Sequence, residues 1–224
     1  MPPVRPNPFD RGAADADEYD DWYASATGRR VLHAEQECVS TLLHGAPRPW
    51  LDLGTGSGRF GGAVQAEVGL DPAPDLLRIA ARRMPAVVRG VGESLPFGEA
   101  TFGAVLAVAV FEFLDDPIPV FREVGRVVRP GGRFVIGFFP REGPWAEAYR
   151  AQGCDSGSVF HGAVFFSPGD LGAIATATGF VVEGARATLF ERPGSAHAEP
   201  AAAHADPRAG FVAIALRRQS EGTP

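Results

Sequence analysis

The sequence is poor in cysteine, has no excess of positive charge and contains no long apolar run. Its two cysteines, Cys38 and Cys154, are too few and too far apart for a disulfide framework or a zinc cluster, and we interpret each as a small buried hydrophobe. The 21 basic and 27 acidic residues leave a net charge of −6, which disfavours a polyanionic partner. We therefore expect no nucleic-acid partner.

The 224 residues, 45% of them hydrophobic, are enough for one domain with a sizeable core. No apolar run approaches the about 18 residues that a membrane span needs. The N-terminal segment, Met1–Pro8, carries prolines where a signal peptide needs an apolar helix. We expect a cytoplasmic protein without membrane contact, a monomer or weak dimer that acts on a small molecule.

A short apolar segment that contains an acid runs directly into a glycine-rich turn. The segment Leu51–Leu53 is followed by Gly54-Thr55-Gly56-Ser57-Gly58, with three glycines at alternate positions. Such a turn after a strand brings backbone N–H groups close to a ligand, and its glycines tolerate positive φ. A tight turn without a ligand is the alternative, but three glycines plus an acid exceed what a turn needs. The stretch predicts a site for a small, partly polar ligand.

Two cofactor types use a turn of this kind. The spacing Gly56-x-Gly58-x-x-Gly61 matches dinucleotide folds, which is a weak signal in a chain with 28 glycines. Asp52, at the end of the strand, would repel a pyrophosphate but suits the ammonium group of S-adenosylmethionine. The sequence therefore favours S-adenosylmethionine, with an NAD-dependent oxidoreductase as the weaker alternative.

The glycine turn is similar to the first motif of class I S-adenosylmethionine-dependent methyltransferases, apolar residues followed by D/E-x-G-x-G-x-G. Three further segments resemble the family in the same order: Gly69–Pro72 resembles the end of the second strand, Gly92–Phe97 the loop after the third, and Arg122–Gly132 the helix and turn before the fifth. The subgroup is the one often called methyltransferase type 11, which includes ubiquinone and menaquinone biosynthesis methyltransferases.

The resemblance implies a Rossmann-like α/β fold. We expect a mostly parallel seven-stranded sheet with an antiparallel edge strand, helices on both faces, an N-terminal extension and helical cap over residues 1–45, and a cofactor-binding domain over 46–224. The chain predicts strands at 50–53, 68–71, 86–89, 101–110, 133–139, 181–190 and 210–217. It predicts helices over 15–26, 28–44, 117–128 and 167–178. It also predicts a short helix that begins at 59, one that ends at 83 and one that begins at 144.

Two segments carry no regular pattern. The first dozen residues are proline-rich and are expected to be extended or disordered. Residues 192–209 read as a mobile loop rich in Ala, Pro and His. His197 and His204 lie in it, but without an acid or cysteine at supporting spacing we expect no metal site.

The cofactor site is expected to use the glycine turn and two acids. Asp71 lies 19 positions beyond Asp52, where α/β nucleotide folds place an acid for the ribose hydroxyls; a helix N-cap is its alternative role. In relatives the loop at Val91 closes over adenine, often with an Asp at that position, so we expect backbone contacts here. The predicted cofactor-binding residues are Asp52, Gly54, Thr55, Gly56, Gly58, Asp71, Pro72, Gly92 and Glu93.

The acceptor pocket is expected to be aromatic. Tyr19, Trp22 and Tyr23 share one face of a helix at spacings of three and four, and in the resembled fold this segment encloses the substrate. Docking of the helix to the core is an equally weighted alternative. The predicted pocket residues are Tyr19, Trp22, Tyr23, Phe111, Trp145 and Tyr149.

Methyl transfer from a sulfonium needs mainly in-line positioning in a dry pocket. A base is required only for a protonated amine or an unactivated hydroxyl. Glu112, which follows the fourth predicted strand, is the candidate, although a carboxylate turned to solvent or paired with an Arg is its plainer interpretation. His161 is the alternative base. A protein that binds S-adenosylmethionine without catalysis is the main competing function.

Overall fold

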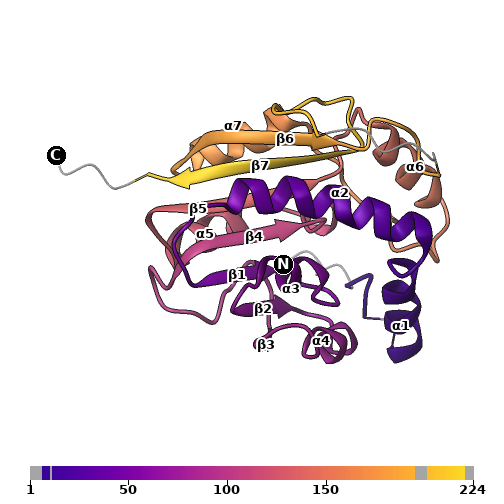
Figure 1. Ribbon diagram of the computed structural model, residues 1–224, viewed down its shortest axis with the longest axis horizontal. Helices are drawn as coiled ribbons and strands as arrows, with labels where there is room; N and C mark the ends of the chain where they lie inside the picture. Colours follow the sequence, from indigo (N-terminus) through magenta and orange to yellow (C-terminus); the bar gives the residue numbers. More distant parts are fainter. Residues whose placement is uncertain (1–6, 11, 195–200, 220–224) are drawn as a thin grey trace.

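The structure is a computed structural model that describes residues 7–10, 12–194 and 201–219. Seven strands form one sheet, with helices on both faces (Figure 1). The strands are β1 (Trp50–Leu53), β2 (Val68–Asp71), β3 (Ala86–Arg89), β4 (Phe102–Val108), β5 (Val128–Phe138), β6 (Phe180–Thr188) and β7 (Phe211–Arg218). The helices are α1 (Ala13–Trp22), α2 (Ala26–Leu43), α3 (Arg59–Val64), α4 (Pro74–Ala80), α5 (Ile118–Val127), α6 (Pro144–Gln152) and α7 (Pro168–Ala177), with a 3₁₀ turn η1 (Phe111–Phe113).

The strand order is β3-β2-β1-β4-β5-β7-β6. Strands β1 to β5 pair in parallel, whereas β7 runs antiparallel to both of its neighbours, β5 and β6. The predicted fold is therefore confirmed, with β6 and β7 as an antiparallel pair at the edge and β7 second from it. The order reverses between β1 and β4, which creates a crevice at the carboxyl ends of these strands, the position where open α/β sheets bind ligands.

The central strands are apolar on both faces because helices cover both sides of a parallel sheet. Every residue of β1 and β4 is buried. Because side chains alternate along a strand, Val105 belongs to the core under α5 and α7, and the adjacent Leu106 belongs to the core under α2. Each helical layer thus has its own hydrophobic cluster.

Helix α2 is part of the core and runs along the β5, β6 and β7 side of the sheet (Figure 1). Its buried side chains, among them Cys38, Val39 and Leu43, pack with Trp50 and Phe211 of the sheet. Of the N-terminal region, it is therefore α1 and residues 7–10 that lie at the carboxyl ends of the strands. The prediction for Cys38 is confirmed, but Cys154 is exposed because it lies in the turn after α6.

The predicted helix over 15–26 ends at Trp22. The chain turns there, and Ser25 caps α2 by accepting a hydrogen bond from Gly28 N at 2.9 Å. Gly28 lies so close to the backbone of Trp22 that a Cβ at this position would collide with it. The corner between α1 and α2 is therefore set by the close contact between Gly28 and the backbone of Trp22. Helix propensity alone does not predict this contact.

Both segments without a predicted regular structure contain ordered parts. Phe9 packs edge-on against Tyr19 and Phe113, with ring centroids 5.6 and 5.0 Å apart, so residues 7–10 are docked. In the predicted mobile loop, Ala202 pairs with Ala187 through two backbone hydrogen bonds of 2.8 and 3.0 Å. His204 is exposed, and His197 lies outside the described residues. Ser167 and Asp170 form a capping box at the start of α7, within the predicted helix range.

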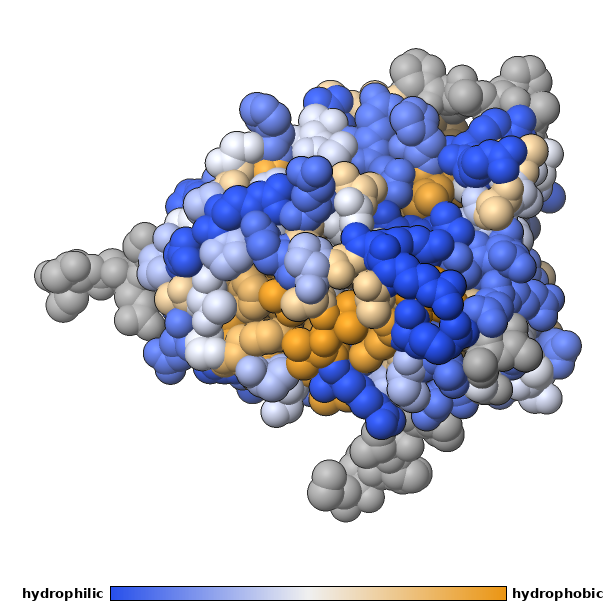
Figure 2. Space-filling view, turned by 60° about the horizontal axis from the view of Figure 1, so that its bottom comes forward, coloured by the Kyte–Doolittle hydropathy of each residue, from blue (hydrophilic) through white to orange (hydrophobic). Residues whose placement is uncertain are grey.

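The β3 edge of the sheet is short and carries mixed polarity. Val87 and Val88 are half-buried between the exposed Ala86 and Arg89, and Val91 beyond the strand is 46% exposed. Figure 2, which brings the lower side of Figure 1 forward, shows apolar surface gathered in the middle of the view with hydrophilic surface around it. A four-residue edge strand flanked by charge limits pairing with other chains. Within the described ranges, no helix is long and apolar enough to cross a membrane.

The close contact between Gly103 of β4 and the backbone of Pro47 gives a testable prediction about stability. A Cβ at this position of β4 would collide with the backbone oxygen of Pro47, which cannot move aside as a flexible side chain could. We expect Gly103→Ala to lower the free energy of unfolding by about 1–3 kcal/mol in urea denaturation. Gly172 in α7 has open space at the same place, so Gly172→Ala should be neutral or stabilise by up to about 1 kcal/mol. Equal stability of the two variants would contradict the close approach.

Candidate active site

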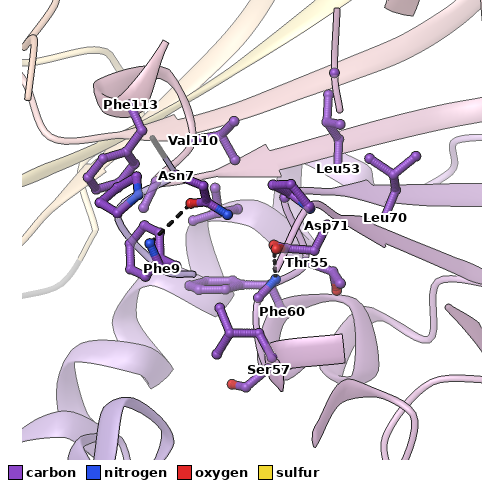
Figure 3. A pocket seen from close by; sticks show the side chains of 18 of the residues that line it. Asn7, Phe9, Leu53, Thr55, Ser57, Phe60, Leu70, Asp71, Val110 and Phe113 are labelled. Atoms are coloured by element: carbon purple, nitrogen blue, oxygen red, sulfur yellow. Dashed lines mark hydrogen bonds between the residues drawn. The ribbon is translucent and has the colours of Figure 1, made fainter. Parts of the chain in front are cut away.

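A cavity of about 360 Å³ lies at the carboxyl ends of β1, β2 and β4. The glycine turn and the ends of these strands form one side of it, and residues 7–9, α1 and η1 form the other (Figure 3). The lining residues are Asn7, Pro8, Phe9, Tyr19, Tyr23, Leu53, Gly54, Thr55, Gly56, Ser57, Arg59, Phe60, Leu70, Asp71, Pro72, Leu76, Val91, Gly92, Glu93, Val108, Ala109, Val110, Phe113 and Leu114. Its volume falls in the range of small-molecule sites.

The glycine turn is held in a left-handed conformation that brings its backbone to the cavity. Gly54, Gly56 and Gly58 have φ of +71°, +53° and +80°. At Gly54 a Cβ would also collide with the side chain of Val110. The turn is tied to β2, because Gly54 N and Thr55 N both donate to the oxygen of Leu70, at 2.7 and 3.0 Å. These constraints explain the alternating glycines.

Asp71 lines the cavity with its carboxylate (Figure 3). Its Oδ2 accepts a hydrogen bond from Gly56 N and its Oδ1 accepts one from Ala73 N, both at 2.8 Å. Burial raises the pKa of this carboxyl, and the two backbone donors oppose that shift. Helix α4 has no side-chain cap, so the alternative of an N-cap does not describe Asp71. Each oxygen keeps further acceptor capacity for a ligand hydroxyl.

Asp52 lies beneath the turn and is not among the residues that line the cavity. Its Oδ2 accepts hydrogen bonds from Thr55 Oγ1 at 2.6 Å and from Gly61 N at 2.9 Å. Gly58, the N-cap of α3, has no side chain to cap the helix, so Asp52 supplies that acceptor from β1. Burial raises the pKa of Asp52 to about 6. The structure gives Asp52 a role in shaping the turn, and its predicted contact with a methionine ammonium stays a prediction.

Aromatic rings close the cavity opposite the turn. Tyr19 and Tyr23 are edge-on at 5.5 Å with hydroxyl oxygens 3.2 Å apart, and Phe9 connects Tyr19 to Phe113. Trp22 is 43% exposed and does not line the cavity, because α1 turns it outward. Of the predicted aromatic face, the structure thus brings the two tyrosines to the site.

Asp20 anchors α1 beside this cavity. It accepts hydrogen bonds from Arg59 Nε and from Arg83 Nη2, both at 2.7 Å, and so connects α1 to α3 and to the segment after α4. Burial alone would raise the pKa of Asp20, but the hydrogen bonds from Arg83 and Arg59 lower it to about 2. The helix that carries Tyr19 is therefore held by charge as well as by ring contacts.

Glu112 is buried, contrary to its plainer interpretation as a solvent-exposed side chain. Its Oε1 accepts a hydrogen bond from Phe139 N at 2.8 Å, whereas its Oε2 has no hydrogen-bond partner within the described part of the chain. Burial raises the pKa of Glu112 to about 7. The residue lies in η1, directly before the cavity-lining Phe113.

Glu35 is a second buried acid, which the sequence reading missed. It lies on α2 with 3% exposure, and burial together with repulsion from Glu112 raises its pKa to about 8. Its position in the apolar stripe of α2, between Leu32 and Cys38, is the signal that could have identified it. Tyr149 joins this group, because burial and the charges of Glu35, Tyr19 and Glu112 raise its pKa well above the usual value.

The other predicted residues lie farther from the cavity. Phe111 packs in the core against Phe121, and Trp145 is buried with its Nε1 donating to the oxygen of Glu191. His161 is exposed, with its Nδ1 3.0 Å from the oxygen of Gly153. In the described ranges, no group of three or more metal-ligating side chains comes together. The sequence analysis also missed the cavity-lining Asn7, Pro8, Phe9, Ser57, Arg59, Phe60 and Leu76.

Comparison with known proteins decides the family. The family model described as a methyltransferase domain matches residues 51–136. An uncharacterised protein of Mycobacterium tuberculosis is 38% identical over 208 residues, which cover 92% of this chain and 73% of that protein. A solved structure from Thermotoga maritima, described as a SAM-dependent methyltransferase and possible histamine N-methyltransferase, has a TM-score of 0.83 at 26% identity and covers 92% of this chain and 97% of that one. The chain belongs to the class I methyltransferases of type 11.

The cofactor of this methyltransferase family is S-adenosylmethionine. A magnesium protoporphyrin IX methyltransferase from Synechocystis PCC 6803 with bound S-adenosylhomocysteine shares the fold, with a TM-score of 0.67 at 14% identity over 94% of this chain and 96% of that one. The cavity fits such a cofactor. Asp71 offers acceptor capacity for a diol, and a Cβ on Gly56 would meet nothing closer than Tyr19 at 4.0 Å, so the turn is open to the cavity.

The raised pKa of Glu35 predicts a pH-dependent cost in stability. Between about pH 4.5 and about pH 8 the folded protein binds more protons at this carboxyl than the unfolded chain, so its contribution to stability falls as pH rises. We expect Glu35→Gln to raise the melting temperature above wild type, with a difference that grows from pH 4.5 to 8, by about 2–4 °C for each kcal/mol. The exposed neighbour Glu37 provides the control Glu37→Gln, which should show no such growth. A pH-independent difference for Glu35→Gln would contradict the assignment.

The anchoring of α1 predicts that its order depends on Asp20. Asp20→Asn should weaken the bonds to Arg59 and Arg83, at a cost on the order of 1 kcal/mol, and speed amide exchange in residues 15–23 about fivefold. S-adenosylhomocysteine should slow exchange in the same residues of the wild type. Hydrogen exchange with mass spectrometry measures both effects. Asp21→Asn, at an exposed position next to it, is the control; if both variants exchange alike, the arginine contacts do not hold the helix.

Proposed function

We propose that this methyltransferase transfers the methyl group of S-adenosylmethionine to a small molecule. The observation that carries the proposal is the cavity between the glycine turn and the aromatic wall, where the buried Glu112 directly precedes the cavity-lining Phe113. The description of the Thermotoga maritima structure as a possible histamine N-methyltransferase supports the same acceptor class.

The residues of this chain divide the work of the proposed reaction. Bound S-adenosylmethionine supplies an electrophilic methyl group on a sulfonium. Asp71 and the turn at Gly56 bind and orient the nucleoside end, while Gly92 and Glu93, which line the cavity, offer contacts to the adenine. The rings of Tyr19 and Phe113 exclude water from the acceptor. Glu112 can hold a proton or a positive charge at Oε2.

Two parts of the proposal concern the whole protein. We propose that α1 and residues 7–10 act as the cap over the site, within an N-terminal region that the sequence places at residues 1–45. The cytoplasmic location and the monomeric or weakly dimeric state stay predictions. His161 is retained as the alternative base, although Glu112 has the unpartnered oxygen that such a role needs.

Turnover separates catalysis from binding without chemistry. Purified protein would be incubated with S-adenosylmethionine labelled in the methyl group and a fractionated metabolite extract, and the labelled product would be identified by mass. Formation of S-adenosylhomocysteine coupled to one labelled small molecule supports the proposal. Binding of the cofactor without transfer to any fraction favours the non-catalytic alternative, and binding of NADH in place of the cofactor favours the oxidoreductase.

The role of Asp71 gives a sharper test of the cofactor site. Asp71→Ala removes charge-assisted hydrogen bonds to the ribose and the support of Gly56 N, so the affinity for S-adenosylhomocysteine should fall by about 1.5–3 kcal/mol in calorimetry. Asp75→Ala is the matched control, because Asp75 carries the same charge four positions later but does not line the cavity. Unchanged affinity in a folded Asp71→Ala protein would sink the assignment.

A further inference from the structure

Five polar side chains from four elements gather beyond the aromatic wall of the cavity. Tyr19 and Tyr23 come from α1 and its end, Glu35 from α2, Glu112 from η1 and Tyr149 from α6. Figure 1 shows α1 and α6 at the same end of the sheet, the end toward which the arrow of β4 points. Tyr19 and Tyr23 line the cavity, and the charge of Glu35 acts on both of their hydroxyls.

The aromatic rings make this group continuous with the cavity. Phe113, which lines the cavity, contacts the ring of Phe160 at 5.9 Å, and Phe160 stacks on Tyr149 at 3.9 Å with an interplanar angle of 14°. Tyr149 in turn lies within the electrostatic reach of both Glu35 and Glu112. Neither acid lines the cavity, but Glu112 lies next to its aromatic end because it directly precedes Phe113 in η1, and its charge acts on Glu35.

Neither acid has a cationic partner among the described residues. No ion pair within residues 7–10, 12–194 and 201–219 involves Glu35 or Glu112, and no hydrogen bond or nearby cation opposes the effect of burial and of Glu112 on the pKa of Glu35. Glu112 is 1% exposed, and its Oε2 is an orphaned buried acceptor. Two neighbouring buried carboxyls without a cation are costly, because ionising one opposes ionising the other. A cation bound between the two carboxyls would offset that cost.

We propose that the methyl acceptor is an amine, bound as a cation between Glu35 and Glu112 and enclosed by the rings of the three tyrosines. This inference rests on the proposed methyl transfer and names its substrate class. Carboxylates supply the charge complement, and aromatic faces attract a cation electrostatically while they exclude water. A neutral hydroxyl acceptor would leave the pair uncompensated.

The proposed step balances with the residues in place. The amine enters as an ammonium, and ionised Glu112 takes one proton from it at Oε2, which frees the nitrogen lone pair. The lone pair forms the N–C bond to the methyl carbon as the C–S bond breaks, and the bond's electron pair goes to sulfur. The product is a methylammonium ion and neutral S-adenosylhomocysteine, and protonated Glu112 later returns its proton to solvent. Glu35 is a positioning residue that keeps charge near the amine.

Binding of defined probes to protein saturated with S-adenosylhomocysteine tests this inference. The probes are two isosteric pairs, ethylamine with ethanol and phenethylamine with phenethyl alcohol, measured by calorimetry between about pH 7 and about pH 8. We expect each amine to bind about tenfold or more tightly than its alcohol. We also expect proton release on amine binding, seen as a dependence of the heat on the ionisation enthalpy of the buffer, because the acids then lose a proton. The groups that face the pair are Tyr19, Tyr23 and Tyr149, which stay protonated in this range.

Substitution of the two acids tests whether they cause the preference for amines over alcohols. Glu112→Gln and Glu35→Gln should each reduce the preference for the amine about tenfold and leave the affinity for S-adenosylhomocysteine unchanged. The exposed Glu37→Gln should keep the preference. Amines that bind no more tightly than their alcohols, or a preference that survives both variants, would overturn the inference while leaving the methyltransferase proposal intact. Failure of the protein to bind S-adenosylhomocysteine would instead count against the proposed function.

Discussion

The carboxylate of Asp71 holds together the two backbone turns on which the site depends. Through one oxygen it fixes Gly56 in the turn after β1, and through the other it fixes Ala73 in the turn after β2. These turns follow neighbouring parallel strands, so a single side chain sets the distance between them. Asp52 supports the same turn from below through Gly61. The two acids thus supply rigidity that a glycine-rich segment lacks, and they add to the apolar packing of Leu53 and Leu70 on this side of the cavity.

The opposite side of the cavity is held by weaker and more varied contacts. Rings from Phe9, Tyr19 and Phe113 pack edge to edge, and Asp20 adds charged hydrogen bonds to Arg59. Edge-on aromatic pairs and partly exposed ion pairs contribute about 1 kcal/mol each, far less than the core under β4. The cavity therefore has one rigid wall and one wall that can open at modest cost. Such a division suits an enclosed site that must admit and release two ligands.

The sequence predicted the parts of the fold that depend on local pattern. Strands β1, β2 and β3 were placed at their exact residues, because short apolar runs between glycines and prolines define them. The sequence pattern did not predict which way side chains point in turns and at helix ends. Trp22 faces outward because the chain turns against Gly28, and Asp52 points beneath the turn. Phe9 reaches the cavity through tertiary packing, which no spacing in the sequence expresses, whereas the position of Glu35 in the apolar stripe of α2 was a signal that the sequence did contain.

The buried acids show why stability alone does not explain this structure. Replacing Glu35 by an apolar residue would fill the stripe of α2 and remove a desolvation cost, and Glu112 leaves one oxygen without a partner. Both pKa values, about 8 and about 7, lie where a proton can be gained or lost with little free energy at neutral pH. A pair of buried acids with raised pKa values, one of them next to the cavity-lining Phe113, has the properties that a cationic ligand would use.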